Sequence, residues 1–158
     1  MKTEIRKLVD PDDATLELIT GWMWGWWGEE VHRTYEEIRS FMKYSTLADR
    51  LPQTYGLYVD DTLVGLYQLR LDDLFTRPDI YPWLANVYVH TPYRGRGYGK
   101  LMMERVREIA AENLPDAKLY LFTHHVGLYE KYGWKFVSLI DTVTGTPRMQ
   151  RFYELELR

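Results

Sequence analysis

A strand, a loop with three glycines and a long helix follow one another in the middle of the chain, and this succession constrains the fold most. Apolar residues alternate along 84–90 as they do in strands, and Gly95, Gly97 and Gly99 lie in the loop that follows. From about Gly97 to Asn113 the apolar residues recur at helical spacing. Such a chain packs a helix against a sheet, which places it in the mixed α/β class.

The rest of the sequence extends this pattern to both ends of the chain. The predicted strands are 4–9, 55–59, 63–71, 84–90, 119–122, 134–140 and 152–157, and the predicted helices are 16–23, 34–44, 97–113 and 126–132. We expect a break after the first helix at Gly25 and Gly28, and a capping box formed by Thr34 and Glu37. This order predicts a mixed, mostly antiparallel central sheet flanked by helices. No linker or internal repeat interrupts it, so residues 1–158 are expected to form a single domain.

Composition excludes several classes of function. The absence of cysteine excludes disulfides, thiolate catalysis and zinc–sulfur sites. The net charge of −3 does not favour nucleic acid or anionic membranes as partners. No signal core and no uninterrupted apolar run of about 18 residues is present, so a soluble cytoplasmic protein is the expectation. The four histidines do not form a convincing metal set, and we expect no metal cofactor.

The glycine loop has the chemistry of an anion site. Glycines let the backbone approach a ligand closely, and the first turn of a helix presents unpaired N–H groups with the positive end of the helix dipole behind them. A phosphate or pyrophosphate satisfies both features, and Arg94, Arg96 and Lys100 add positive charge. The loop is not a Walker motif, because no Gly-Lys-Ser/Thr follows, and it is a poor dinucleotide fingerprint.

Two motifs resemble the GNAT family of N-acetyltransferases. The segment 94–99, Arg-Gly-Arg-Gly-Tyr-Gly, matches that family's Arg/Gln-x-x-Gly-x-Gly/Ala loop, and 127–134, Gly-Leu-Tyr-Glu-Lys-Tyr-Gly-Trp, resembles its "LYEKxGF" segment. The resemblance covers nearly the whole chain and implies the acyl-CoA N-acyltransferase fold, with acetyl-CoA as co-substrate. The residues implied to bind acetyl-CoA are Val87, Tyr88, Val89, Arg94, Gly95, Arg96, Gly97, Tyr98, Gly99, Lys100 and Thr123.

The resemblance also implies an acetyl transfer and one catalytic residue. Direct attack by an amine on a thioester requires a proton acceptor for the amine, a stabilised oxyanion and a proton donor for the departing thiolate. Tyr129 occupies the position of the family's proposed general acid, and a phenol with an ordinary pKa of about 10 is protonated at neutral pH. A backbone N–H of the segment 87–89 is implied as the oxyanion donor. Thr123 stands where relatives often carry an asparagine.

The sequence does not identify which residue acts as the general base. Many relatives carry a glutamate on the strand before the loop, whereas this chain has Trp83-Leu84-Ala85-Asn86 there. Asn86 takes no proton, although its amide can hold a water molecule. The carboxylates and the imidazole closest to the expected cleft are Asp72, Asp73, Asp79 and His124. For each of them a solvated surface role competes with the catalytic one.

Four tryptophans within six positions, Trp22, Trp24, Trp26 and Trp27, give the chain its local peak of aromatic residues. In the family this region forms a wall of the acceptor site, and aromatic faces attract the protonated amine of an acceptor. Core packing of the same rings is the competing interpretation. The acceptor is therefore expected to be a small-molecule or peptide amine, with the segment 81–83 as an opposite wall.

Two other functions remain open alongside the acetyltransferase. A domain of this fold that binds acetyl-CoA as a sensor or partner module would need no base, and the absent glutamate fits it. A nucleotide-binding domain that holds ATP is weaker, because acidic Mg²⁺ ligands at a recognisable spacing are absent. Homodimers are frequent in the family that the chain resembles, but no residue pattern here specifies an interface.

Overall fold

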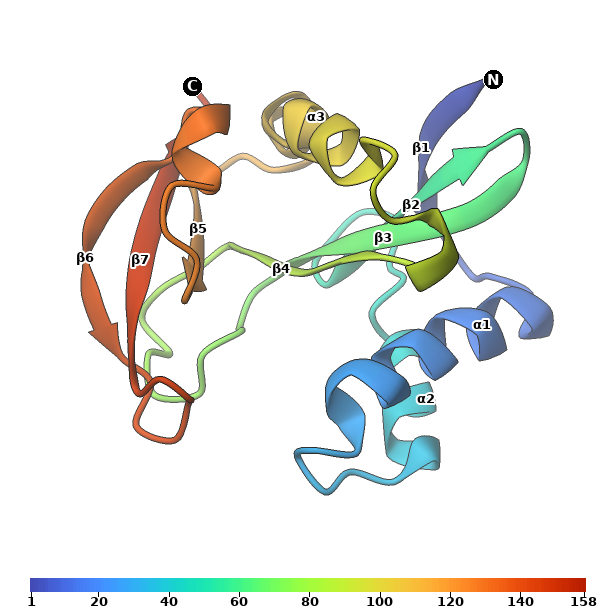
Figure 1. Cartoon of the computed structure of the whole chain (residues 1–158), viewed down its shortest axis with the longest axis horizontal. Coiled ribbons are helices and arrows are strands. Elements are labelled where there is room, and N and C mark those ends of the chain that lie inside the picture. Colours follow the sequence, from blue (N-terminus) through green and yellow to red (C-terminus); the bar gives the residue numbers. More distant parts are fainter.

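Seven strands form one sheet with helices on both of its faces (Figure 1). The computed structural model describes residues 1–158. In chain order the elements are β1 (Thr3–Leu8), α1 (Asp13–Met23), the π-turn η1 (Trp24–Gly28), α2 (Tyr35–Lys43), β2 (Gln53–Val59), β3 (Thr62–Arg70), β4 (Trp83–Val89), the 3₁₀ turn η2 (Thr91–Tyr93), α3 (Tyr98–Asn113), β5 (Lys118–Thr123), the 3₁₀ turn η3 (Tyr129–Tyr132), β6 (Lys135–Asp141) and β7 (Met149–Glu156).

The strands lie in the order β1-β2-β3-β4-β5-β7-β6. Every neighbouring pair is antiparallel except β4 and β5, which run parallel. This confirms the predicted mixed, mostly antiparallel sheet. Since parallel neighbours need a crossover connection, α3 joins β4 to β5 across one face of the sheet.

The sheet divides between β4 and β5. The two strands share a single register pair, Trp83 with Tyr120, supported by the Tyr120 N–H donating to the Pro82 carbonyl at 3.0 Å. Beyond Trp83 the strands separate, and Figure 1 shows β5, β7 and β6 turning away from β1 to β4. The edge of β4 that faces β5 is consequently without a strand partner along most of its length.

A β-bulge lies in β4 at the point where the strands separate. Leu66 pairs with Tyr88 and Gln68 with Ala85, so β4 contains one residue more than β3 between the two pairs. Asn86 takes up the extra length in the left-handed region with φ +54°, which asparagine tolerates better than most residues. The bulge turns its side chain toward Gln68, whose Oε1 accepts from Asn86 Nδ2 at 2.7 Å.

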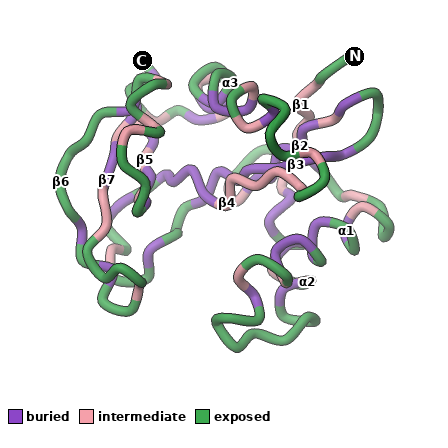
Figure 2. Tube along the Cα trace, in the orientation of Figure 1, coloured by how far each residue is buried: buried purple, intermediate pink, exposed green.

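Both faces of the sheet are covered, and the interior strand β3 is accordingly apolar on both sides from Leu63 to Tyr67. Val64 and Leu69 pack in a core of 20 residues beneath α3. Leu63 and Leu66 pack against α1 and α2 in a second core on the other face. Figure 2 shows these strands as buried backbone between more exposed helices. No helix of the structure combines the length and the apolar character that a membrane crossing requires.

The predicted capping box at the start of α2 is present. The Glu37 N–H donates to Thr34 Oγ1 at 3.0 Å, and the Thr34 N–H donates back to Glu37 Oε1 at 2.9 Å. We expect Thr34→Ala to lower the free energy of unfolding by about 1 kcal/mol in urea titrations, because two N–H groups lose their acceptors or their alignment. Thr34→Ser keeps the hydroxyl and should stay close to wild type. Equal losses in both variants would contradict the role of the cap.

The predicted break is wrong at Gly25, whereas the helical run does end at Gly28. The chain continues from α1 directly into the π-turn of 24–28, where the Glu29 N–H reaches back to the Trp24 carbonyl at 3.3 Å. A π-turn widens the helix by one residue and redirects the side chains on it. Gly25 therefore accommodates a change of helical pitch inside the run, and Gly28 is its last residue.

Two predicted boundaries near the C-terminus also require correction. The helix expected at 126–132 is only the 3₁₀ turn 129–132, because Gly127 has φ +80° and interrupts a helical path. The last strand begins at Met149, three residues before the predicted Phe152. Its first residues are exposed and polar in part, so they lack the alternation that marks a strand in sequence.

Candidate functional site

A hollow of about 220 Å³ lies between the separated strands β4 and β5. We call it the β4–β5 hollow. It is lined by Trp26, Asp73, Leu84, Ala85, Asn86, Val87, Leu121, Phe122, Thr123, His124, His125 and Tyr129. These residues come from η1, the β3–β4 connection, both strands and η3, so elements distant in sequence meet at this one opening. The structure contains no cluster of three or more His, Asp or Glu side chains spaced to hold a metal ion.

The glycine loop between β4 and α3 is shaped for close approach of a ligand. Gly95 and Gly97 have φ of +77° and +84°, and no heavy atom lies within 4 Å of a Cβ placed on either. Gly97 occupies the N-cap of α3 without a side-chain cap. The backbone N–H groups of residues 95–100 donate to no acceptor in the protein. The loop thus presents several free donors at the positive end of a 16-residue helix.

The three basic side chains of this loop differ in their surroundings. Arg94 donates through Nε to the Val89 carbonyl at 2.7 Å, which ties the loop to the end of β4. The Arg96 guanidinium lies 5.7 Å from the centre of the Tyr93 ring and makes no ion pair. Lys100 is 3.8 Å from Glu104, a contact between two exposed groups that contributes little. Arg96 and Lys100 are the cations free to meet an anion here.

The segment Val87–Val89 presents its two faces to different partners. Val87 and Val89 pack toward the core beneath α3. The Tyr88 ring points the other way and lies 5.4 Å from Trp22 and 5.5 Å from Trp26. What this segment offers the opening is its backbone, since the β5 side of β4 has no strand partner there.

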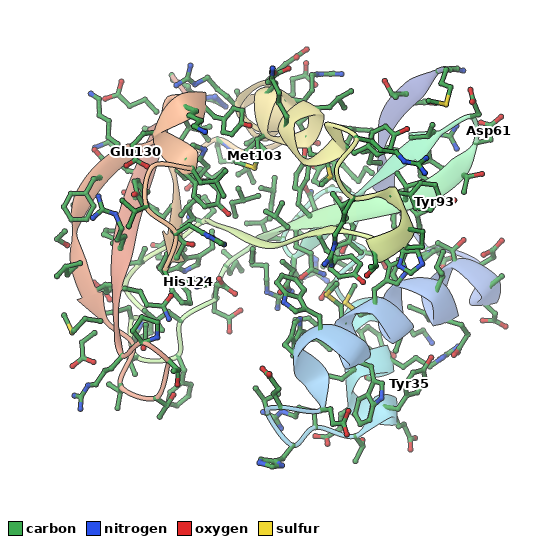
Figure 3. The ribbon with its side chains drawn as sticks, in the orientation of Figure 1. Tyr35, Asp61, Tyr93, Met103, His124 and Glu130 are labelled. Carbon is green, nitrogen blue, oxygen red and sulfur yellow. The ribbon has the colours of Figure 1, made fainter.

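Tyr129 lies beside the opening at the start of η3. Its ring packs edge-on against Trp134 and at a tilt against Tyr153, each with centroids 6.2 Å away. Burial raises the pKa of the Tyr129 hydroxyl above its ordinary value, so the phenol remains protonated at neutral pH. Thr123 ends β5 in the same wall and accepts the His125 N–H at 3.1 Å, and Figure 3 labels its neighbour His124.

Asp73 is the carboxylate at the centre of the cleft. It lines the β4–β5 hollow and two further hollows next to it, and the residue as a whole is exposed at their common rim. The surrounding walls desolvate the carboxylate and raise the pKa of Asp73 to about 7; Asp72 raises it further, while the nearby Arg70 guanidinium opposes the rise. A carboxyl group with such a pKa exists in both protonation states near neutral pH.

Of the other candidates for the base, Asp72 and Asp79 lie in less suitable places, whereas His124 shares the hollow of Asp73. Asp72 is largely exposed and lines only one hollow of the cleft, where it approaches Arg70 at 3.7 Å. Asp79 forms a two-bond contact with Arg77 on the surface and lines none of these hollows. His124 lines the β4–β5 hollow and stacks on His125 with ring centroids 4.3 Å apart.

The tryptophan cluster divides into core and cleft. Trp22 is buried and stacks on His90 at 5.2 Å, as the core-packing interpretation holds for this residue. Trp24 contacts Tyr35 on the outside of α2. The π-turn directs Trp26 to the β4–β5 hollow and Trp27 to the two hollows beyond Asp73. Two of the four rings therefore line the cleft.

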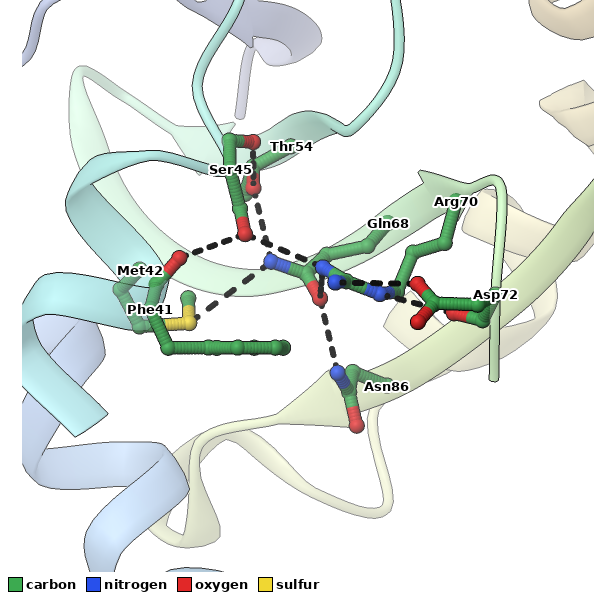
Figure 4. A network of polar contacts seen from close by, with 8 residues as sticks. All are labelled: Phe41, Met42, Ser45, Thr54, Gln68, Arg70, Asp72 and Asn86. Atoms are coloured by element: carbon green, nitrogen blue, oxygen red, sulfur yellow. Dashed lines mark hydrogen bonds and ion pairs between the residues drawn. The ribbon is translucent and has the colours of Figure 1, made fainter. Parts of the chain in front are cut away.

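A buried polar network that was not predicted from the sequence lies beside the cleft (Figure 4). Gln68 connects it, because its Nε2 donates to Thr54 at 3.0 Å while its Oε1 accepts from Asn86 and Arg70. The one sequence pattern that could have predicted this network is the alternation of polar residues at the end of a strand. Gln68 and Arg70 follow that alternation at the end of β3. Sequence alone does not show that both faces of β3 are covered there.

A sequence model of the acetyltransferase (GNAT) family matches residues 16–134. The spermine/spermidine N(1)-acetyltransferase of Bacillus subtilis (strain 168) is 28% identical over 93 residues, which are 54% of this chain and 61% of that protein. The match thus spans less than two thirds of this curated relative's length.

Solved structures of acetyltransferases share the fold. An aminoglycoside 6'-N-acetyltransferase complexed with coenzyme A superposes with a TM-score of 0.74 at 13% identity, over 98% of this chain and 97% of that one. The spermidine N-acetyltransferase of Vibrio cholerae, in complex with CoA and spermine, gives 0.72 at 16% identity, over 98% and 95%. At these identities the likeness establishes the common fold.

Proposed function

The chain belongs to the GNAT acetyltransferase family, and on that premise we propose that it transfers acetyl from acetyl-CoA to a primary amine of a small molecule or peptide. The observation that carries the proposal is the convergence of Asp73 and Tyr129 on the opening between β4 and β5. One residue is suited to accept a proton and the other to donate one near neutral pH. We take residues 1–158 as one catalytic domain.

The glycine loop fits the pyrophosphate of acetyl-CoA. The free N–H groups of 95–100 and the cations of Arg96 and Lys100 supply donors and charge, and the unobstructed Gly95 and Gly97 permit contact with the backbone. Beyond the loop, the unpaired edge of Val87–Val89 offers hydrogen bonds to the pantetheine amides, and Thr123 lies on the opposite wall. Acetyl-CoA supplies the activated acyl group as a thioester.

The residues of the chain then divide the proton transfers between them. Asp73, in its ionised form, accepts the proton that the amine loses when its nitrogen bonds to the thioester carbonyl carbon. A free N–H on the β5-facing edge of β4 stabilises the negative oxygen. Tyr129 donates its hydroxyl proton to the sulfur as the carbon–sulfur bond breaks. The products are an amide and the free thiol of CoA, and no covalent intermediate with the protein is needed.

The thiol released from acetyl-CoA tests the proposal, measured across polyamines, aminoglycosides, amino acids and short peptides. Polyamines belong in the panel because a curated relative is named for spermine and spermidine. Acceptor-dependent release supports the acetyltransferase. If calorimetry shows acetyl-CoA binding while every acceptor leaves the thiol signal at background, the sensor function is favoured instead. Loss of binding to acetyl-CoA when ATP is added would favour the nucleotide-binding alternative.

We expect Gly97→Ala to weaken acetyl-CoA binding by about tenfold or more. Alanine at φ +84° is strained by about 1–2 kcal/mol, and an exposed loop relieves that strain by rotating its N–H groups away from the anion. Isothermal calorimetry with acetyl-CoA measures the change. Gly21→Ala is the matched control, because Gly21 lies inside α1 with open space around it. Equal affinities in wild type and Gly97→Ala would contradict the assignment of the loop.

A further inference from the structure

Two more hollows continue the cleft beyond Asp73, away from the β4–β5 hollow. They measure about 300 and 850 Å³, and both are lined by Trp27, Phe41, Arg70, Asp73 and Phe75. We call them the Arg70 hollows. The smaller one also shares Asn86 with the β4–β5 hollow. A ligand whose amine lies beside Asp73 therefore has the Arg70 hollows as the space for the rest of its structure.

Arg70 brings a buried positive charge to this space. Its side chain is nine-tenths buried, and its guanidinium lies 4.3 Å from the centre of the Phe41 ring. Nη1 donates to Ser45 Oγ at 3.0 Å and to Gln68 Oε1 at 3.3 Å, and Nε donates to the Asp72 carbonyl at 3.2 Å (Figure 4). All three partners are neutral.

The remaining nitrogen of that guanidinium, Nη2, has no hydrogen-bond acceptor. Its nearest carboxylate is Asp72 at 3.7 Å, beyond hydrogen-bond length, and the Asp72 side chain is 84% exposed. An ion pair with a carboxylate in water stabilises a buried guanidinium only weakly. Buried charges in proteins are ordinarily paired and hydrogen-bonded, so Arg70 is a buried cation whose charge is incompletely matched.

Trp27, which lines the same two hollows, carries a second donor without a partner. The indole Nε1–H of Trp27 is buried and has no acceptor in the protein. A buried N–H without a partner costs about 1–3 kcal/mol, and a ligand that accepts a hydrogen bond removes this cost. Trp27 and Arg70 come from η1 and β3, so two separate elements each bring a residue with an unpaired donor to the lining of these hollows.

The other charged groups that line these hollows are Arg33, Glu37, Asp72 and Asp73, and the Asp73 carboxylate is near enough to Arg70 for the two charges to interact. Glu37 pairs with Arg33 at 3.3 Å, and both side chains are at least half exposed. Asp72 is solvated, and Asp73 has the role of base in the proposed function. A polycationic acceptor would have to place a second cation against Arg70, which like-charge repulsion in a poorly hydrated site disfavours.

We propose that Arg70 and Trp27 bind a carboxylate of the acceptor, so that the amine acetylated by this chain is an amino acid or an acidic peptide N-terminus. The inference rests on the proposed function and names its substrate class. Arg70 supplies a charge-assisted hydrogen bond from Nη2, and Trp27 supplies a second bond from its indole. The carboxylate is held in the Arg70 hollows while the amine faces Asp73 and the β4–β5 hollow.

The test compares each amine with a partner that lacks only the carboxylate. The pairs are phenylalanine with 2-phenylethylamine, lysine with cadaverine, and C-terminally amidated tetrapeptides that begin with Asp or with Asn. Thiol release at saturating acetyl-CoA gives kcat/KM for each member. We expect wild type to favour the carboxylate-bearing member of at least one pair by about tenfold or more. The amino-acid and peptide pairs distinguish the two sources of the carboxylate.

Arg70→Gln provides the decisive comparison. We expect it to lower kcat/KM for the carboxylate-bearing member by about 10- to 100-fold. The kcat/KM of the member that lacks the carboxylate should change by less than about threefold. Trp27→Phe should lower the ratio of the two kcat/KM values by a smaller factor. Arg39→Gln, an arginine on α2 outside the hollows, is the matched control. Thermal melting identifies a variant that fails to fold, and Arg70→Lys then replaces it, since lysine keeps the charge without the fork of donors.

The failure of this inference differs from the failure of the proposed function. If cadaverine, 2-phenylethylamine or a polyamine is acetylated as well as its carboxylate-bearing counterpart, and Arg70→Gln leaves the ratios unchanged, the carboxylate subsite is wrong while the acetyltransferase stands. If no amine in either set releases thiol, the proposed function itself fails.

Discussion

Asp73→Asn is expected to lower kcat/KM for acetyl transfer by about 10²–10⁴-fold, the usual contribution of a general base, with little change in acetyl-CoA binding. Asparagine keeps the shape of the side chain but accepts no proton. Asp73 lines the cleft and does not touch the glycine loop, so the affinity for acetyl-CoA should be preserved. Steady-state kinetics by thiol release and calorimetry with acetyl-CoA measure the two quantities on the same preparations.

The proposed role of Asp73 also predicts the direction in which kcat/KM changes with pH. The pKa of Asp73 is raised to about 7, so below pH 7 the carboxyl is protonated and unable to act as a base. In wild type kcat/KM should therefore rise with pH up to about 7 on account of this group, and in Asp73→Asn that rise should disappear. Asp79→Asn, outside the cleft, should retain the wild-type profile.

Stability separates a catalytic loss from a structural one. A carboxyl whose pKa is raised on folding stabilises the folded state fully only below its unfolded pKa, and this contribution is lost as pH rises through 7. At pH 8 asparagine removes an unfavourable charge, so Asp73→Asn should melt no lower than wild type. If Asp73→Asn keeps kcat/KM within about threefold of wild type and shows the same rise with pH, Asp73 is not the base. That result would favour His124 or a water molecule as the base.

Tyr129→Phe is expected to lower kcat by about 10²-fold or more, with unchanged affinity for acetyl-CoA. The variant removes the hydroxyl that donates to the departing thiolate in the proposed reaction. The ring keeps its contacts with Trp134 and Tyr153, so packing is preserved. Because burial raises the pKa of Tyr129, the wild-type phenol is protonated across the neutral range, and the lost turnover should not be recovered by changing pH between 6 and 9.

Tyr132→Phe is the matched control for this residue. Tyr132 belongs to the same 3₁₀ turn but lines a different hollow, between α3 and the end of β7. It should retain nearly full activity. A loss of the same size in both variants would indicate that the turn, and not the Tyr129 hydroxyl, is sensitive to substitution. No loss in Tyr129→Phe would assign the proton donor to water or to another group.

Local chemistry explains what could be predicted from the sequence. The loop of 94–99 constrains its own conformation, because glycines at positive φ precede a helix whose first N–H groups need an acceptor. The Thr34–Glu37 box likewise depends on residues three positions apart. These features, together with the order of strands and helices, identified the fold and the family.

Features that depend on contacts between distant elements were not predictable. The separation of β4 from β5 follows from packing across the sheet. The residue types of β4 do not by themselves predict the bulge at Asn86. Asp73 was one of four candidate bases, and its place in all three hollows of the cleft depends on contacts between distant elements. The π-turn that sends Trp26 and Trp27 to the cleft and leaves Trp22 in the core was not predicted.

The most direct test of the proposed reaction follows the acetyl group itself. The protein is incubated with acetyl-CoA labelled in the acetyl carbon and with the best acceptor, and the label is located by mass spectrometry in the amine, in free acetate and on the protein. Direct transfer at the β4–β5 opening predicts label on the amine nitrogen in the same amount as the thiol released, with none bound to the protein. Thiol released with the label in acetate, or label retained on the protein, would contradict direct transfer to the amine.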